Sequence, residues 1–175
     1  MLNRLFNLQD RARTVVLAVT VVTILLAINV EIAGKEHIVR NGESVLLRIA
    51  PRDPRSLLQG DYMALRYSMA SVVAKEANSL EMNDGSIVIE LGELNVAEFI
   101  SIYTGQPLKE GQHLLRYRKR GDSVRLASDA YFFEEGSWQK YRPARFGEIR
   151  INAKGDAVLI GLRDAQGARL GPALH

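Results

Sequence analysis

The 175-residue sequence contains no cysteine, which excludes disulfide bonds and every catalytic or metal site built on thiolates. Histidine is scarce, and His37, His113 and His175 are scattered without the spacing of metal ligands. Low-complexity tracts and convincing internal repeats are also missing, which argues against large-scale disorder and repeat architectures. The sequence therefore predicts one domain with an added segment, and it predicts neither a metal nor a cofactor.

A strong excess of one charge sign is missing as well. From residue 35 onward the chain has 20 basic and 18 acidic residues, so the basic pI of 9.3 does not reflect a large basic surface. Nucleic-acid binding would require a larger basic excess, and we expect no nucleic-acid partner. The strand-like run at residues 116–120 mixes arginine, lysine and tyrosine, but alternate strand residues face opposite sides. We expect this run to be a solvated edge strand.

One long apolar run is present near the N-terminus. Residues 14–30 contain no charge, glycine or proline, and residues 14–34 contain only Glu31 as a charged side chain. A helix of about 20 residues spans the hydrocarbon core of a bilayer, so this segment predicts contact with lipid as a transmembrane signal anchor. Because Arg4, Arg11 and Arg13 precede the run, the positive-inside rule places residues 1–13 in the cytoplasm as a basic tail.

Two other interpretations of the apolar run were weighed. A cleaved signal peptide would have an apolar region of about 7–15 residues and a small-x-small cleavage site, and residues 27–29 and 32–34 match such a site poorly. A buried helix of a soluble protein would show one polar face, which this segment lacks. An uncleaved anchor in the bacterial inner membrane, with the remaining chain in the periplasm, is favoured over both.

The rest of the chain alternates short apolar runs with glycine and aspartate turns. Such spacing favours a mainly β fold, and we expect a compact antiparallel β-barrel or sandwich-like extracytoplasmic domain over residues 35–165, followed by a flexible tail at 166–175. Hairpins are expected at 113–127 and 146–162. Residues 69–79 fit a short helix or an irregular segment, and 95–103 fit a strand or a helical turn. The expected strands cover 43–50, 62–68, 86–92, 113–119, 123–127, 146–152 and 156–162.

Residues 51–67 form the densest stretch of the chain, PRDPRSLLQGDYMALRY. Proline and Gly-Asp favour turns, and arginine can bind a nearby carboxylate through two hydrogen bonds. The following strand should place alternate side chains on one face. The segment therefore predicts a stiff loop and a strand that either specify the fold or bind a partner. The candidate residues are Pro51, Asp53, Pro54, Arg55, Ser56, Gly60, Asp61, Tyr62, Leu65 and Tyr67.

Residues 60–67 match the pattern Gly-Asp-Tyr-x-x-Leu-x-Tyr at every specified position. The chain resembles the GDYXXLXY family of bacterial membrane-anchored proteins, and both residues 51–57 and the segment YFFEEG at 131–136 strengthen the resemblance. The resemblance implies a protein without an assigned activity. It also implies a multi-pass inner-membrane protein as partner, so the chain is expected to act as an interaction or accessory subunit.

A hydrolase is the second class considered. Type I signal peptidases carry the pattern Ser-Met-x-Pro-Thr-Leu-x-x-Gly-Asp in a membrane-anchored β-domain. Aligning its Gly-Asp with residues 60–61 places Arg52 at the nucleophile, and arginine cannot attack a carbonyl. Ser56 would be the substitute nucleophile, and Lys119 could supply a base only if such a nucleophile existed. No intact catalytic constellation is present, so we expect a degenerate relative at most.

A third hypothesis is a sensor domain that binds a ligand or an envelope polymer. Such a domain would be stabilised by its ligand against heat. The sequence names no ligand, and it leaves the accessory-subunit, sensor and degenerate-hydrolase hypotheses open, in that order of preference.

Overall fold

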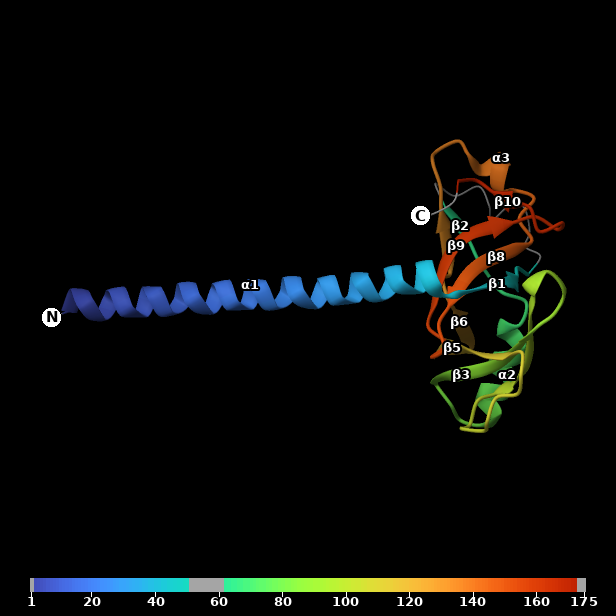
Figure 1. Ribbon diagram of the computed structural model, residues 1–175, viewed down its shortest axis with the longest axis horizontal. Coiled ribbons are helices and arrows are strands. Elements are labelled where there is room, and N and C mark those ends of the chain that lie inside the picture. The colour runs from blue at the N-terminus through green and yellow to red at the C-terminus, as the bar shows by residue number, and fades with distance from the viewer. Residues whose placement is uncertain (1, 51–61, 173–175) are drawn as a thin grey trace. The chain divides into compact units, whose positions relative to one another are not determined.

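The computed structural model describes residues 2–50 and 62–172, with side chains from residue 13 onward. The chain divides into two compact units, Met1–His37 and Ile38–His175. The first unit consists of most of helix α1 (Leu2–Asn41), and the second contains the strands together with the last turn of α1 (Figure 1).

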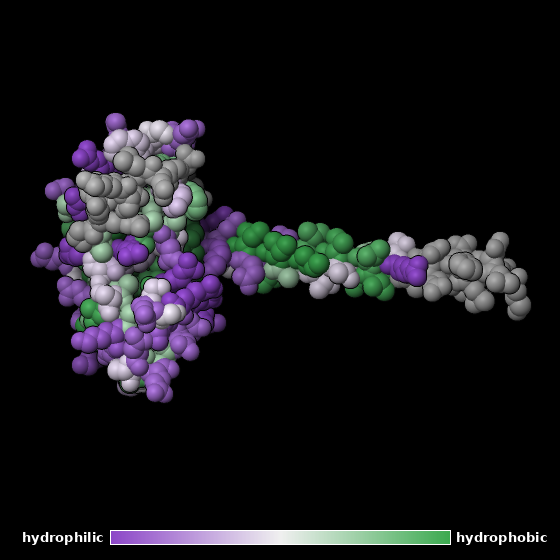
Figure 2. Space-filling view, turned by 180° about the vertical axis from the view of Figure 1, so that it is seen from behind, coloured by the Kyte–Doolittle hydropathy of each residue, from purple (hydrophilic) through white to green (hydrophobic). Residues whose placement is uncertain are grey.

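The stretch Arg13–Asn41 of α1 is long and apolar enough to cross a membrane, with a mean hydropathy of 2.5 over its most apolar window. Figure 2 shows hydrophobic side chains covering much of this helix. Its polar side chains bond within the helix: Thr20 Oγ1 donates to the carbonyl of Val16 at 2.9 Å, and Asn29 Nδ2 donates to that of Leu25 at 2.7 Å. Such internal bonds lower the cost of polar groups in an apolar surrounding.

Helix α1 is longer than the sequence predicted. It continues through residues 35–41, beyond the transmembrane segment predicted at 14–34. The Gly42 N–H donates to the Ile38 carbonyl at 2.8 Å, and the Ile38 side chain is buried in the second unit. Burial of the Ile38 side chain stabilises the helix beyond the end of the apolar run.

The second unit contains two curled, four-stranded antiparallel sheets, each a half-barrel, which confirms the predicted mainly β fold. An isolated parallel bridge between Leu46 and Val96 brings an edge of one sheet to the other. The first sheet has the order β1 (Glu43–Arg48), β8 (Phe146–Ile151), β9 (Ala157–Arg163) and β10 (Arg169–Leu170). The second has the order β4 (Ala97–Ile102), β3 (Asp84–Leu91), β5 (Gln112–Arg120) and β6 (Ser123–Leu126).

The remaining elements are short. Strands β2 (Tyr62–Ala64) and β7 (Ala130–Phe132) form a separate two-stranded sheet. Helix α2 (Ala70–Ser79) buries Val73, Ala74 and Ala77 and packs against β6 and β4, because apolar residues three and four apart share a helix face. The turn η2 (Glu93–Asn95) and helix α3 (Trp138–Tyr141) complete the described elements.

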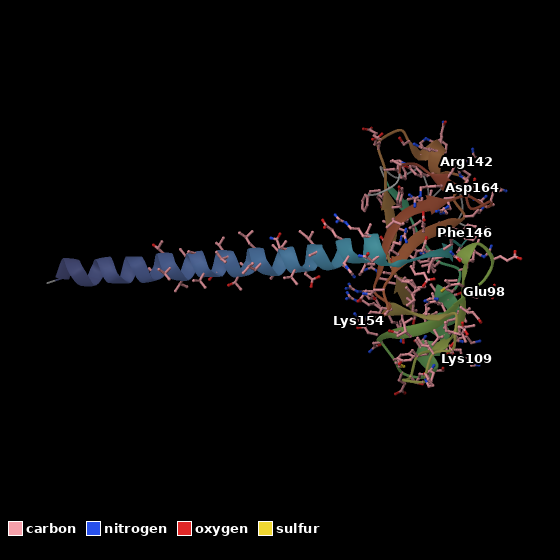
Figure 3. All side chains as sticks on the ribbon, viewed as in Figure 1. Glu98, Lys109, Arg142, Phe146, Lys154 and Asp164 are labelled. Carbon is pink, nitrogen blue, oxygen red and sulfur yellow. The ribbon has the colours of Figure 1, made fainter. Side chains whose placement is uncertain are left out.

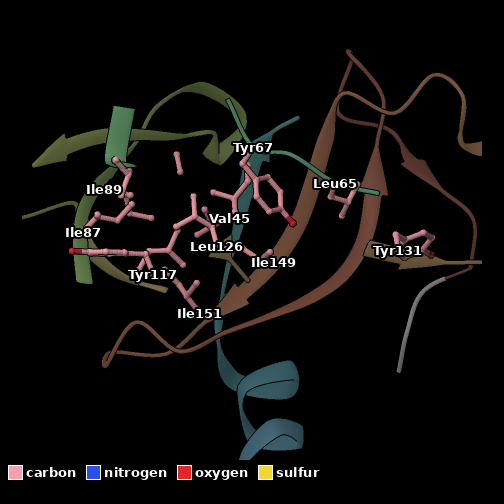
Figure 4. Close-up of a cluster of buried hydrophobic side chains, with 14 of the residues drawn as sticks. Val45, Leu65, Tyr67, Ile87, Ile89, Tyr117, Leu126, Tyr131, Ile149 and Ile151 are labelled. Carbon is pink, nitrogen blue, oxygen red and sulfur yellow. The ribbon is translucent and has the colours of Figure 1, made fainter. Parts of the chain in front are cut away.

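The core of the second unit is built from alternate residues of the strands. Both predicted hairpins are confirmed, β5 with β6 and β8 with β9. The ambiguous segment 95–103 is strand β4, and segment 69–79 contains helix α2. Figure 4 shows the buried side chains that these elements bring together, among them Val45, Tyr67, Ile87, Tyr117 and Ile149.

Two local predictions about strands differ from the structure. The strand expected at 62–68 ends at Ala64, although an isolated bridge still joins Tyr67 to Ile49. The run 116–120 is not an edge strand, because β5 pairs with β3 on one side and β6 on the other. Both differences arise because the length of a strand and its place in a sheet depend on which strands pair. Local alternation of side chains does not specify that pairing.

The tail expected to be flexible at 166–175 begins with ordered structure. The Asp164 carboxylate accepts the backbone N–H groups of Gln166 and Ala168 at 3.0 and 2.8 Å, and Gly167 has a positive φ of 80°. This turn returns the chain so that β10 pairs with β9. The sequence Asp-Ala-Gln-Gly at 164–167 is a turn signal, because aspartate accepts backbone hydrogen bonds and glycine adopts a positive φ.

Candidate functional site

Most of the predicted site residues lie outside the part of the chain that the structure describes. Tyr62, Leu65 and Tyr67 are the candidates that the structure places, and they begin and follow strand β2. The candidates outside the described residues are Pro51, Asp53, Pro54, Arg55, Ser56, Gly60 and Asp61.

The structure joins the two motifs that the sequence singled out separately. Strand β2 pairs with β7, with Tyr62 opposite Phe132 and Met63 opposite Tyr131. The Leu65 N–H extends the pairing by donating to the Asp129 carbonyl at 2.7 Å. We call β2 and β7 together, residues 62–64 and 130–132, the motif ribbon.

The inner face of this region belongs to the core. Met63, Leu65 and Tyr67 are all buried, as the predicted alternation required. Tyr67 donates its hydroxyl hydrogen to the Ser128 carbonyl at 3.0 Å. Its ring lies against Gly147, where an added Cβ would stand 3.1 Å from Tyr67 Cε1. Glycine at 147 therefore lets β8 approach the motif tyrosine closely.

The environment of Tyr67 favours the neutral phenol. Burial raises the pKa of Tyr67 far above its ordinary value of 10, and the negative charge of Asp129 raises it further. The hydrogen bond to the Ser128 carbonyl is made by the protonated hydroxyl. Tyr67 is thus a structural anchor, and its hydroxyl is not placed to act as a base.

Three further aromatic rings anchor β7 to the segment that follows it. The ring centroids of Tyr131 and Tyr141 lie 5.3 Å apart, and those of Phe133 and Tyr141 lie 5.0 Å apart. Burial, together with the hydrogen bond that the Tyr131 hydroxyl donates to Tyr141, raises the pKa of Tyr131 to about 12. These contacts pack β7 and the residue after it against Tyr141 of helix α3.

The outer face of the motif ribbon carries two exposed aromatic side chains. Tyr62 is 43% exposed and Phe132 is 74% exposed, and their ring centroids lie 5.7 Å apart. Glu134 and Glu135 follow Phe133 in the chain and are exposed. An exposed pair of rings beside carboxylates is a candidate binding surface, because isolated exposed aromatics are common but paired rings on a strand present a larger apolar area.

A buried charge cluster forms a second centre that the sequence did not reveal. Glu148 on β8 is only 1% exposed and accepts hydrogen bonds on both carboxylate oxygens. Arg163 Nη2 donates to Oε1 at 2.7 Å, and Arg169 donates to Oε2 through Nη2 at 2.7 Å and Nε at 3.1 Å. Ser44 Oγ lies 3.3 Å from Oε1.

The cluster holds the C-terminal strand in place. Burial alone favours a neutral carboxyl, but the hydrogen bonds and charges of Arg163 and Arg169 outweigh it and lower the pKa of Glu148 below its ordinary value. Arg163 also donates to the Gly167 carbonyl at 2.7 Å, which ties the turn before β10 to the same group. Figure 3 shows Asp164, the start of this turn, beside β10.

Local sequence indicated only part of this cluster. Because Ile149 and Ile151 point into the core, alternation places Glu148 on the opposite face, where a carboxylate would ordinarily meet water. Its burial depends on arginines that lie 15 and 21 residues later in the chain. No short-range pattern selects those two arginines from the others.

The remaining candidates from the sequence are the basic run 116–120 and the hydrolase residues Ser56 and Lys119. Tyr117 is buried within the run 116–120, while Arg116 pairs with Asp156 at 2.8 Å on the surface. This alternation leaves Arg116, Arg118 and Arg120 exposed on the same face of β5, opposite the buried Tyr117. Lys119 lies on β5, and Ser56 lies outside the described residues, so the hydrolase hypothesis stays a hypothesis. Among residues 2–50 and 62–172, no group of three histidine, aspartate or glutamate side chains could hold a metal ion.

Comparison with known proteins gives one match. No curated protein and no solved structure matches the chain. The family model described as GDYXXLXY protein matches residues 24–162, which is most of the chain and includes both strands of the motif ribbon. Of the residues that specify its pattern, Tyr62 pairs with Phe132 of β7, and Leu65 and Tyr67 bond to the carbonyls of Asp129 and Ser128 just before β7. On this match, the chain belongs to the GDYXXLXY protein family.

Proposed function

We propose that the protein is an accessory subunit that attaches its β-rich unit to a multi-pass membrane protein. The apolar stretch of α1 is suited to anchoring the chain in a membrane. The second unit begins at Ile38, only a few residues after the end of the apolar run, so an anchored chain keeps the unit close to the bilayer. A partner within the same membrane is therefore within reach.

The observation that carries the proposal is the pair of exposed rings on the motif ribbon. The family pattern includes Tyr62, Leu65 and Tyr67. Burial accounts for Leu65 and Tyr67, whereas Tyr62 remains 43% exposed at the surface. Tyrosine is enriched at protein interfaces because it buries a large apolar area and still offers a hydroxyl group.

The proposed location is the bacterial inner membrane, with the N-terminus in the cytoplasm and the β-rich unit in the periplasm. Arg4, Arg11 and Arg13 precede the apolar stretch, and the positive-inside rule supports this orientation. A reporter fused after His175 tests it. An enzyme active only in the periplasm should be active in that fusion, and activity of a cytoplasm-only reporter would contradict the proposed orientation.

Co-purification tests the partner. The intact protein, extracted from native membranes in mild detergent, should recover one multi-pass membrane protein reproducibly. In the control variant, a segment of leucine and alanine with the same number of residues replaces residues 14–30. This variant keeps a membrane anchor and the same β-rich unit. Repeated recovery of no specific membrane protein would remove the proposal.

A further inference from the structure

We propose that the outer face of the motif ribbon docks an extended polypeptide segment of the partner, one that carries an apolar side chain beside a lysine or arginine. This docking surface consists of Tyr62, Phe132, Glu134 and Glu135. The inference rests on the proposed function, because it assigns the site and the chemistry through which the accessory subunit holds its partner.

The two rings of Tyr62 and Phe132 are exposed at the surface and are not part of the core. Along β2, Met63 and Leu65 are buried while Tyr62 is 43% exposed, and along β7, Tyr131 is buried while Phe132 is 74% exposed. The exposed rings contact each other at 5.7 Å between centroids. Together they form a continuous apolar surface on one side of a two-stranded sheet.

The scaffold beneath the rings is rigid. Tyr131 is the buried neighbour of Phe132 on β7. Its ring packs on the ring of Tyr141, with the centroids 5.3 Å apart. Phe133 stacks on the same Tyr141 ring at 5.0 Å. A partner therefore meets rings whose backbone is already ordered, which reduces the entropic cost of binding.

The negative charge of Glu134 and Glu135 indicates which class of partner to expect. Phe133 packs on Tyr141, and Glu134 and Glu135 follow it where the chain leaves β7 and enters a turn, so both carboxylates lie within three residues of Phe132 along the chain. Glu134 and Glu135 are exposed, and neither side chain forms an ion pair with any described residue. A basic side chain of a partner would complement them, whereas an anionic lipid surface would be repelled. Charge complementarity thus favours a basic and apolar polypeptide over lipid.

Site-specific photocrosslinking in the intact protein tests the docking surface. p-Benzoylphenylalanine replaces Phe132 in one variant, Val72 in a second and Leu26 in a third. Val72 is a matched control because it is 51% exposed on α2, and Leu26 reports a partner beside α1 independently of the motif ribbon. After irradiation in native membranes, the adducts are purified and the cross-linked peptides are identified by mass spectrometry.

The expected adduct at position 132 joins the protein to an extramembrane segment of a membrane protein, with a lysine or arginine within a few residues of the cross-link. Position 72 should give at most a minor yield of it. Adding Glu134→Lys and Glu135→Lys to the position-132 variant should lower the yield about five- to tenfold, because attraction becomes repulsion. Glu110→Lys, a charge change on an exposed residue elsewhere, should leave the yield unchanged.

Adducts at position 132 to lipid, to a second copy, to residues 51–61 of the same chain, or to a segment without basic residues would overturn the inference. So would a yield that is insensitive to the charge reversal. If position 26 captures a membrane protein and position 132 does not, the docking surface is wrong while the proposed function stands. If neither position captures one and co-purification also fails, both proposals fall.

Discussion

Tyr67 and Glu148 each connect strand β8 to another part of the fold, but one does so through apolar packing and the other through charge. Tyr67 joins β2 to β8 through a buried ring that lies against Gly147. Glu148, the next residue along β8, joins β8 to β9 and β10 through two arginines. One connection uses apolar packing and the other uses a buried charge, although they begin at adjacent positions of one strand and on its two faces.

The difference lies in what each connection requires of its surroundings. A ring in the core is stabilised by many weak contacts and tolerates partial loss of them. A buried carboxylate depends on a few hydrogen bonds, and losing one partner leaves an uncompensated charge. The ring should therefore be sensitive to changes in volume, and the cluster should be sensitive to changes in charge and pH.

The largest expected effect is that of Tyr67→Ala. Removing a buried aromatic ring leaves a cavity, and we expect the free energy of unfolding to fall by about 3–5 kcal/mol. Thermal and urea unfolding of the intact protein in detergent, followed by near-ultraviolet circular dichroism, measures the loss. Tyr62→Ala on the same strand is the control. Equal losses for the two tyrosines would contradict the division into a buried and an exposed face.

Glu148→Gln should follow, with a loss of about 3 kcal/mol, because two arginines would keep their burial and lose their counter-charge. Glu134→Gln, which changes an exposed carboxylate, should change stability by less than about 0.5 kcal/mol. The combined change Glu148→Leu, Arg163→Met and Arg169→Leu should recover most of the loss, because a buried ion cluster can be replaced by apolar packing. Failure of the apolar triple to recover stability would show that charge itself is required there.

The same cluster predicts an acid limit. Because the pKa of Glu148 is lower in the folded protein than in the unfolded chain, its stabilisation is complete above its ordinary pKa of 4.5 and is lost as pH falls through the folded pKa. Wild type should therefore lose stability at acid pH more steeply than Glu148→Gln. Unfolding midpoints measured from pH 7 down to pH 3 compare the two slopes. Parallel slopes would mean that Glu148 is not the group that titrates.

Gly147→Ala tests the packing side of the comparison at an intermediate size of effect. The new Cβ would stand 3.1 Å from Tyr67 Cε1 and 3.3 Å from Leu159 Cδ1, so we expect a loss of about 1–3 kcal/mol from overpacking. Adding Tyr67→Leu should make the alanine less costly, since the smaller side chain leaves space. A double-mutant cycle measures this coupling, and strict additivity would remove the proposed contact.

Tyr67→Phe should have a smaller effect at neutral pH, about 1 kcal/mol, from loss of the hydrogen bond to the Ser128 carbonyl. Burial raises the pKa of Tyr67, so the unfolded chain ionises first and wild-type stability falls as pH rises above about 10. Tyr67→Phe should flatten that alkaline decline. Unfolding midpoints between pH 8 and 11 measure it, and an unchanged decline would assign it to other groups.

The smallest effect on stability is expected for Phe132→Ser, below about 1 kcal/mol, because the ring is exposed and loses mainly its contact with Tyr62. The same substitution should reduce recovery of the membrane partner in detergent. Val72→Ser on α2 is the matched control and should leave recovery unchanged. Full recovery of the membrane partner with Phe132→Ser would show that the motif ribbon does not bind the partner.

Local sequence predicted those parts of the fold that depend on local periodicity. The apolar helix follows from an unbroken run of apolar residues, and the burial of Met63, Leu65 and Tyr67 follows from strand alternation. The two predicted hairpins follow from turn residues between alternating runs, as for β8 and β9. The same local signals overextended β2 to residue 68, because they do not show where a strand loses its partner.

Tertiary structure decided which distant segments meet. It paired β2 with β7, so that two motifs about 70 residues apart became one ribbon with an aromatic outer face. It also buried Glu148 by bringing Arg163 and Arg169 to it, and it placed residues 169–170 of the expected flexible tail in strand β10. The physical reason is that side-chain periodicity acts over a few residues, whereas strand pairing and charge burial depend on contacts between segments far apart in the chain. By itself the sequence determined an apolar helix and a set of strands with known inner faces, and the tertiary structure determined their partners.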